Sequence, residues 1–394
     1  MTSATQRVYL HIGLPKTGTT SLQELMWHHR DALAADGVFF PGHDLGAHHR
    51  AAMDVHPGRY GDWRETRTAG SWAWIVEEAR SFRGTTVISS ELLAPASPEE
   101  AAQVLSAFGF AEVHVVCTAR DLARQIPSVW QENVKTRQST SFAELLASLR
   151  GGELDDTARL FWDYQDLPRV LRTWSQGLPS DRVHVVTVPP RGARPGLLWE
   201  RFASLLGLDP ARYSTDVPHY GNFSLGYAET ELLRRVNQAL DDDFPWLHYA
   251  GSVKDRFAAT VLAGRSGRTH IPLPKQDAGW VRDTAERHIA EVTAAGVDVV
   301  GDLAELLPAD PPADPPETAE GLEPGDAELL DIAVTAIADL LQRPAEATSA
   351  PARRPPKKAR AVRLRQVVMQ LSEQYPQVMS ARRAYWRAKA RLRR

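Results

Sequence analysis

The sequence predicts a three-layer α/β domain, in which helices cover a central parallel sheet, followed by a C-terminal helical extension. Three observations support this prediction. Predicted strands alternate with predicted helices over residues 7–307, which is typical of parallel sheets. Residues 113–119 form a nearly all-apolar run, as expected of a strand buried on both faces. Residues 8–23 pass from an apolar strand through a Gly- and Thr-rich turn into a helix.

The first strand and its turn are the most informative part of the chain. The strand 8–12 leads into the turn GLPKTGTT, and a helix begins near Ser21. Free N–H groups and the dipole at a helix N-terminus favour an anion, and glycine lets the anion approach the backbone. Lys16 adds a mobile positive charge. Four hydroxyl donors follow it: Thr17, Thr19, Thr20 and Ser21. The stretch therefore predicts an anion-binding loop.

The position of Lys16 separates this loop from a nucleoside-triphosphate P-loop. In the pattern G-x-x-x-x-G-K-[ST], the lysine follows the last glycine and is followed by a hydroxyl for magnesium. Here Lys16 precedes Gly18. The loop therefore fails the nucleoside-triphosphate pattern, and a kinase or NTPase is kept only as an alternative.

The segment after the turn is predicted to hold a helix at 21–35, a short strand at 38–40 and a helix at 72–83. Residues 43–70, between the short strand and the second of these helices, are predicted to be an irregular stretch rich in histidine. No acidic or cysteine partners lie there at a recognisable ligand spacing. We therefore favour a polar loop wall over a metal site.

The next predicted strand, 85–93, contains a carboxylate at its end. Active sites in open α/β sheets lie at the carboxyl ends of the strands, and Glu91 occupies such a position. The alternative is a helix cap or a salt-bridge partner. We expect a catalytic role for Glu91.

A second candidate phosphate site follows the apolar strand 113–119. That strand ends at Arg120, and a helix containing Ser128 comes next. The fork of an arginine gives two charge-assisted hydrogen bonds to a phosphate, and Ser128 adds a neutral donor. Pro127 should bend this helix or mark its true start.

The remaining elements to residue 307 are predicted from the same patterns. The segment 222–226 is expected to open a helix with Ser224 as its N-cap. A further strand is predicted at 182–188, and further helices at 98–108, 141–149, 161–176, 197–206, 257–262 and 280–295.

Two of these motifs together resemble the sulfotransferases that use 3′-phosphoadenosine 5′-phosphosulfate (PAPS). The stretch PKTGTTSLQ at 15–23 resembles their 5′-phosphosulfate loop. Arg120 with Ser128 eight residues later matches their 3′-phosphate motif, and Glu91 matches the position where many members carry a catalytic His or Glu. Some relatives carry a lysine where this chain has Ser89, and the family's usual Gly-x-x-Gly-x-x-Lys pattern is absent.

The resemblance covers about residues 7–305 and implies a P-loop-like domain with PAPS as donor, adenosine 3′,5′-bisphosphate (PAP) as product and no metal. It implies that Glu91 takes a proton from an acceptor hydroxyl or amine, and that Lys16 stabilises charge on the leaving phosphate. Arg120 and Ser128 would hold the 3′-phosphate, with Asn222 and Ser224 as weaker candidates. The 5′-phosphosulfate would contact Pro15, Lys16, Thr17, Gly18, Thr19, Thr20 and Ser21. The acceptor is not implied.

Composition adds expectations about the C-terminus and the compartment. The net charge of −3 is uneven, since residues 353–394 hold fourteen Lys or Arg and one acid, Glu373. We expect a Pro-rich linker at 308–361 with one helix at 326–342, then a basic amphipathic tail at 362–394. The tail predicts attraction to an anionic membrane or an acidic protein, whereas nucleic-acid binding is disfavoured by the acidic body. A solvated or self-docking helix is the alternative.

We expect a cytoplasmic protein, peripheral to a membrane at most. The chain has one cysteine, Cys117, which fits a reducing compartment, and neither a signal-peptide core nor a spanning apolar run is evident. Cys117 lies in an apolar run, so we expect it to be buried and inert. A non-catalytic binding module with the same fold is a further alternative, although the presence of Lys16 and Arg120 favours an enzyme.

Overall fold

The computed structural model describes residues 6–59, 68–151, 155–218, 223–266, 269–309 and 316–342. Asn222 and the predicted basic tail at 362–394 therefore lie outside the described residues. The chain divides into two compact units, 1–337 and 338–394, and the architecture below is that of the first. None of the helices in the described ranges is long and apolar enough to cross a membrane.

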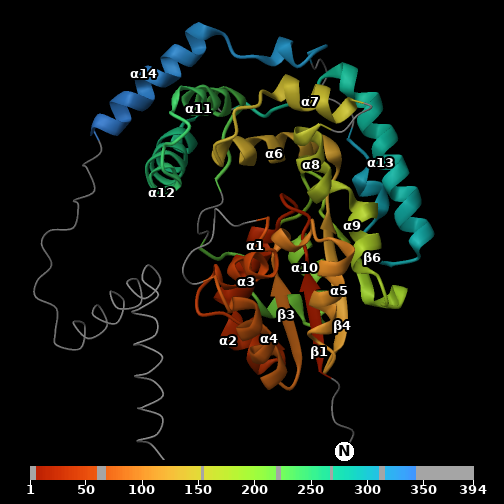
Figure 1. The fold of residues 1–394 in the computed structure, drawn as a ribbon. Coiled ribbons are helices and arrows are strands. Elements are labelled where there is room, and N and C mark those ends of the chain that lie inside the picture. Colours follow the sequence, from red (N-terminus) through yellow and green to blue (C-terminus); the bar gives the residue numbers. More distant parts are fainter. Residues whose placement is uncertain are drawn as a thin grey trace, which may run out of the picture. The chain divides into compact units, whose positions relative to one another are not determined.

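A six-stranded sheet forms the centre of the first unit, in the order β2-β3-β1-β4-β5-β6. Every pairing in the described sheet is parallel, which confirms the predicted central parallel sheet (Figure 1). The carboxyl ends of the strands therefore share one edge. The strands are β1 Arg7–His11, β2 Val38–Phe39, β3 Thr85–Ser89, β4 Glu112–Ala119, β5 Val183–Thr187 and β6 Asp298–Val300.

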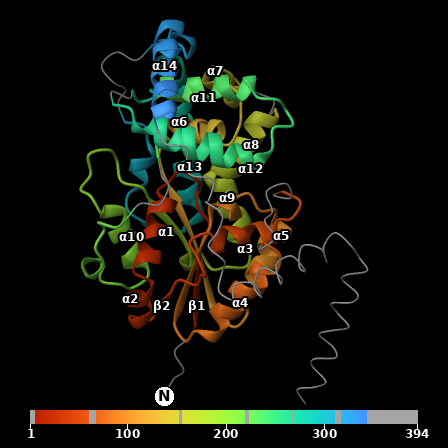
Figure 2. The same ribbon diagram turned by 90° about the vertical axis from the view of Figure 1, so that its left-hand side faces the viewer.

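Helices cover both faces of the sheet, as Figure 2 shows. Successive residues of β1 alternate between two apolar clusters, so that Leu10 packs on one face of the sheet and Tyr9 on the other. One cluster includes residues of α3 Ala47–Val55, α4 Ser71–Ser81, α5 Pro98–Ser106, α9 Leu167–Trp174 and α13 Lys275–Ala295. The other includes residues of α1 Thr19–His28, α2 Arg30–Ala35 and α10 Leu197–Leu205. This arrangement is the three-layer α/β architecture.

Other helices lie beyond the carboxyl ends of the strands. Figures 1 and 2 both show α6 Leu122–Lys135, α7 Phe142–Arg150 and α11 Tyr227–Ala239 there. The candidate site residues on α6 are thus carried at the edge where the strands end. The remaining helices are α8 Asp156–Gln165, α12 Trp246–His248, a π-helix at Tyr249–Val261 and α14 Asp326–Gln342.

Several predicted boundaries are wrong, and the local chemistry explains two of them. The helix predicted at 161–176 is two helices, because the Asp166 side chain accepts a hydrogen bond from Arg169 N–H at 3.1 Å and begins α9 as its N-cap. The helix expected after Ser224 begins at Tyr227 with Gly226 as N-cap, so Ser224 is not its cap.

Four further differences concern the helices. The helix predicted at 21–35 is divided into α1 and α2, and the helix predicted at 257–262 is part of the longer π-helix. The segment 43–70 contains α3, which the sequence did not predict. Pro127 lies inside α6 rather than at its start.

Candidate functional site

The predicted site residues lie on three neighbouring strands. In the order β3-β1-β4, Glu91 follows β3, the turn of residues 13–18 follows β1, and Arg120 follows β4. We call residues 13–18 the Lys16 turn. Since all three strands are parallel, these groups share the edge at which ligands bind in open α/β sheets.

The Lys16 turn is fastened to β4. Leu14 N–H donates to the Thr118 carbonyl at 2.8 Å, and the hydroxyls of Thr17 and Thr118 lie 2.6 Å apart. Lys16 has a φ of +65°, a left-handed conformation that is uncommon outside glycine. Thr17 is fully buried, so its hydroxyl faces the interior, and its predicted contact with an anion is confined to its backbone N–H.

The turn leads directly into the N-terminus of α1. The helix begins at Thr19, and its N-cap residue, Gly18, has no side chain to accept hydrogen bonds from the first-turn N–H groups. Thr19 is buried, Thr20 is half-buried and Ser21 is exposed. The backbone N–H groups in the first turn of α1, with the Thr20 and Ser21 hydroxyls, can therefore bind an anion.

Arg120 and Ser128 are in direct contact. One guanidinium nitrogen of Arg120, Nη2, donates to Ser128 Oγ at 2.8 Å and to the Arg124 carbonyl at 2.6 Å. Burial lowers the pKa of Arg120 to about 10, so the guanidinium stays charged at neutral pH. The cationic and hydroxyl groups predicted for one phosphate are thus held side by side.

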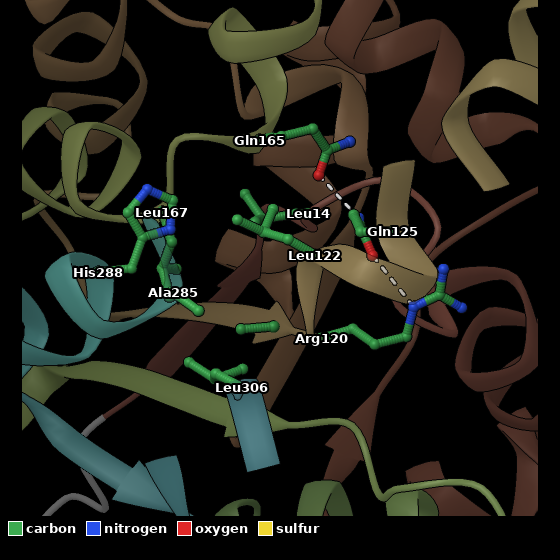
Figure 3. Close-up of a pocket in the computed structure, with 10 residues that line it drawn as sticks. Leu14, Arg120, Leu122, Gln125, Gln165, Leu167, Ala285, His288 and Leu306 are labelled. Carbon is green, nitrogen blue, oxygen red and sulfur yellow. Dashed lines mark hydrogen bonds between the residues drawn. The ribbon is translucent and has the colours of Figure 1, made fainter. Parts of the chain in front are cut away.

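Gln125 connects Arg120 to the Lys16 turn, a connection that the sequence did not predict. Gln125 Oε1 accepts from Arg120 Nε at 3.1 Å, while its Nε2 donates to Gln165 Oε1 at 2.7 Å and to the Pro15 carbonyl. Figure 3 shows the chain of contacts from Gln165 through Gln125 to Arg120. Gln125 is only 1% exposed, so a single buried amide fixes the spacing between the two candidate phosphate-binding groups.

The cavity beside this chain is too small for a nucleotide. It is lined mainly by apolar side chains, among them Leu14, Leu122 and Leu167, and its volume of about 20 Å³ leaves room for about one water molecule. The candidate donor site is therefore the surface formed by the Lys16 turn and α6, and not this cavity.

Lys16 is one of three lysines around a single carboxylate. Its Nζ lies 3.0 Å from Glu132 Oε2, the Nζ of Lys135 lies 2.7 Å from the same oxygen, and the Nζ of Lys254 lies 3.6 Å from Oε1. Burial alone would raise the pKa of Glu132, but the three lysines hold it below its usual value. Burial lowers the pKa of Lys135 to about 8 against the opposing effect of Glu132. This cluster, the Glu132 lysine cluster, carries a net positive charge next to the Lys16 turn.

Glu91 is fixed by three neighbours. Gln23 Nε2 donates to Glu91 Oε2 at 3.2 Å, and His49 Nε2 lies 3.7 Å from Oε1. The backbone of Gly13 is so close that a Cβ there would lie 2.9 Å from the Glu91 Cβ. Burial alone would raise the pKa of Glu91, but the charge and hydrogen bond of His49, with the hydrogen bond from Gln23, together outweigh burial and lower that pKa to about 2. The carboxylate is therefore ionised at neutral pH.

Most other histidines near this edge have structural contacts. His11 lies 2.8 Å from Ser89 Oγ and 3.1 Å from Thr118 Oγ1 and is fully buried. His48 accepts from Ser89 N–H at 2.9 Å and is 3% exposed, while His56 pairs with Glu100 at 2.9 Å. Of these histidines, His49 is thus the one beside Glu91.

Sequence patterns could not identify Gln125, Glu132 or His49 as members of the site. Gln125 meets residues 110 positions earlier, and Glu132 meets a lysine 116 positions earlier. The only sequence signal for Gln125 and Glu132 is local, since both occur on the same helix as Ser128.

No group of histidines, cysteines and carboxylates within the described ranges could hold a metal ion. Comparisons of this chain with protein-family models, curated proteins and solved structures found no match.

Proposed function

We propose that this chain is an enzyme that transfers a sulfuryl group from PAPS to a hydroxyl or amine of an acceptor. One observation carries the proposal. Two separate anion-binding groups, the Lys16 turn with the α1 N-terminus and the pair Arg120–Ser128, follow adjacent parallel strands and are linked through Gln125. A donor with a 5′-phosphosulfate and a separate 3′-phosphate needs two such groups.

The residues of the turn would hold the 5′-phosphosulfate. The N–H groups at residues 17–21 and the hydroxyls of Thr20 and Ser21 supply donors, and Lys16 supplies charge. Arg120 and Ser128 would hold the 3′-phosphate, which distinguishes PAPS from ATP. The Lys16 ammonium contacts Glu132 in the structure, so Lys16 has to exchange this carboxylate for the donor.

The transfer step forms one bond to sulfur and breaks another. The acceptor oxygen or nitrogen bonds to sulfur as the bond from sulfur to the 5′-phosphate oxygen breaks, and PAP leaves. Lys16 and the first-turn N–H groups stabilise the charge that builds on the leaving phosphate. The Glu91 carboxylate favours removal of the acceptor's proton, because its negative charge stabilises the positive charge that the proton carries.

We expect PAP to stabilise the fold without added magnesium, and ATP to do so much less. Both phosphates of PAP have a site in this arrangement, whereas ATP lacks the 3′-phosphate that Arg120 and Ser128 would bind. PAP at about 100 times its dissociation constant should add roughly 2.7 kcal/mol to the free energy of unfolding. Thermal unfolding with PAP, AMP and ATP, each with and without magnesium, measures this.

Two variants test which protein group binds which phosphate of PAP. Arg120→Ala should weaken PAP binding while leaving AMP binding nearly unchanged, and Lys16→Ala should weaken both. Equal stabilisation by ATP and PAP, or a strict need for magnesium, would contradict the sulfotransferase proposal and favour a kinase or NTPase. An Arg120→Ala variant with full PAP affinity would show that the 3′-phosphate binds elsewhere.

A further inference from the structure

His48 fixes the start of α3 at the end of β3. Its Nδ1 accepts the Ser89 N–H at 2.9 Å, and its Nε2–H donates to the Pro41 carbonyl. Both ring nitrogens are thus used, one as acceptor and one as donor, which defines a neutral imidazole. Because His48 is anchored in this way, the next residue, His49, is held where β3 ends and Glu91 begins a short 3-10 helix.

Glu91 is restrained on the sides that face the protein. Gln23 holds Oε2, and Gly13 lies against its Cβ. The other oxygen, Oε1, faces His49 Nε2 at 3.7 Å. The Glu91 side chain is 18% exposed, whereas that of His49 is 34% exposed. Of this pair, His49 is therefore the more accessible to an acceptor, and Glu91 is the more rigidly held.

A general base has to reach the proton that it removes. Since His49 Nε2 faces the carboxylate, the other ring nitrogen, Nδ1, is the one that can point toward a substrate. A carboxylate behind an imidazole fixes the ring's tautomer and stabilises the imidazolium that forms. Glu91 is in position to do both for His49.

We propose that His49 receives the proton of the acceptor and that Glu91 orients the ring and balances its positive charge. This inference rests on the proposed function and names the residue that performs its proton transfer. The proton passes from the acceptor hydroxyl or amine to His49 Nδ1 as the bond from the acceptor to sulfur forms and the bond to the 5′-phosphate oxygen breaks. His49 then returns the proton to solvent.

The charges around the pair agree with these roles. Burial lowers the pKa of His49, but the Glu91 carboxylate outweighs it, so the pKa is raised above 6.5. Arg50 opposes this rise and is itself paired with Asp44 at 2.7 Å. The neighbours His48 and His11 both have a pKa lowered by burial to about 4, so they are neutral when His49 titrates. At their ordinary pKa values, an imidazole is a stronger base than a carboxylate.

The first experiment tests the pair in the free full-length protein, with no donor or acceptor. The pKa of His49 is measured by NMR titration of its ring resonances, assigned with His49→Gln. We expect a pKa above 6.5 in the wild type and a lower one in Glu91→Gln, because the variant removes the facing charge. The ring resonances of His43, which is exposed and packs at a tilt against Trp74, are the control and should be the same in both proteins. An unchanged His49 pKa in Glu91→Gln would overturn the inference.

The second experiment measures turnover of PAPS to PAP with water as the acceptor, across pH. We expect the rate constant at saturating PAPS to rise with pH through the His49 pKa, because the base must be neutral. His49→Gln should lower that rate constant on the order of 10² and leave PAP binding unchanged. Glu91→Gln should move the acidic limb of the profile to lower pH, while the control His43→Gln should behave as wild type.

The outcomes separate this inference from the proposed function. A wild-type rate in His49→Gln, with loss of turnover in Glu91→Gln, would make Glu91 the base and overturn the inference alone. Absence of turnover together with absence of PAP binding would overturn both. If His49→Gln does not fold, His49→Asn replaces it, and the Glu91→Gln shifts in NMR and in the pH profile still decide.

Discussion

Gly13 and Gly37 share a backbone conformation but differ in their surroundings. Both have a positive φ, +100° at Gly13 and +84° at Gly37, which L-residues rarely adopt. A Cβ on Gly37 would meet nothing within 4 Å, whereas one on Gly13 would lie 2.9 Å from the Glu91 Cβ. Gly13 is therefore the residue that lets Glu91 approach the Lys16 turn.

We expect Gly13→Ala to impair turnover much more than Gly37→Ala does. Both substitutions force alanine into a left-handed conformation and should cost about 1–2 kcal/mol of stability. Only Gly13→Ala also displaces Glu91, so its loss of turnover should exceed what its loss of stability explains. Thermal unfolding and PAPS turnover of the two variants, measured side by side, check this. Equal turnover in the folded variants would show that the close approach has no functional importance.

Single residues differed in how far sequence could predict them. The proximity of Arg120 and Ser128 could be predicted, because they lie eight residues apart just after one strand, and they are in contact in the structure. The Lys16 turn could be located because a strand, a turn and a helix start follow one another locally in the sequence, and anion binding there stays a prediction. The contact of His49 with Glu91 could not be predicted, since it joins residues 42 positions apart that are not linked by any local pattern.

At the level of elements, α6 carries most of the charged and polar contacts of the site. Gln125, Ser128, Glu132 and Lys135 all belong to it. Glu132 holds the Lys16 ammonium at 3.0 Å across the gap between α6 and the Lys16 turn. In the absence of a donor, α6 therefore supplies the negative charge that an anion at the turn would replace.

We expect Glu132→Gln to bind PAP more tightly than the wild type, by about fivefold. The variant removes a carboxylate that competes with the anion for Lys16, and a partly exposed ion pair of this kind is worth about 1 kcal/mol. The melting temperature should fall, because Lys135 is 3% exposed and loses its carboxylate partner, keeping only the Phe223 carbonyl and ring. Calorimetric titration with PAP measures the affinity.

The matched control and the double variant show whether Lys16 is responsible. Glu291→Gln removes a carboxylate of α13 that pairs with Arg172 on α9 and with Arg287 on α13. This variant should leave PAP affinity unchanged. In a Lys16→Met background, Glu132→Gln should give no gain. Weaker PAP binding in Glu132→Gln would mean that the carboxylate organises the lysines for the anion rather than competing with it.

The elements that position the site were more predictable than those around it. The strands β3 and β4 follow from apolar runs, because burial on both faces of a parallel sheet leaves few polar positions. The helix α3 was missed because four of the nine residues in its sequence, AHHRAAMDV, are polar, and its helical state depends on packing of Ala51 and Ala52 in the core. The strand β6 was missed because it has only three residues and none of them is fully buried.

At the scale of the whole molecule, buried histidines link stability to pH. Burial lowers the pKa of both His11 and His48 to about 4, below the ordinary value of about 6.5. Between these pH values the unfolded chain binds more protons than the folded one. Stability is therefore complete above about pH 6.5 and falls as the pH approaches 4.

We expect the free energy of unfolding to fall by about 2 kcal/mol per histidine between pH 7 and pH 5. Denaturant titrations across that range measure the fall. His11→Gln removes one titrating group and should reduce the fall over this range by about 2 kcal/mol, whatever its own cost in stability, while His48 and His288, whose pKa burial also lowers to about 4, keep their contributions. A wild-type free energy that stays constant from pH 7 to pH 5 would show that these histidines titrate normally.

The single cysteine makes opening of the central sheet measurable by thiol labelling. Cys117 is fully buried in β4, as the sequence predicts, and burial raises the pKa of its thiol above the ordinary value. A thiol reagent can then react only after the central strand is exposed. We expect labelling of the native protein to be slow and, at high reagent concentration, to proceed at the rate at which the sheet opens. PAP should slow the labelling further if the ligand holds the ends of β1 and β4 together. The labelling rate of the Cys117 sulfur would then report ligand binding at the edge of the sheet, because it depends on how often the centre of the sheet opens.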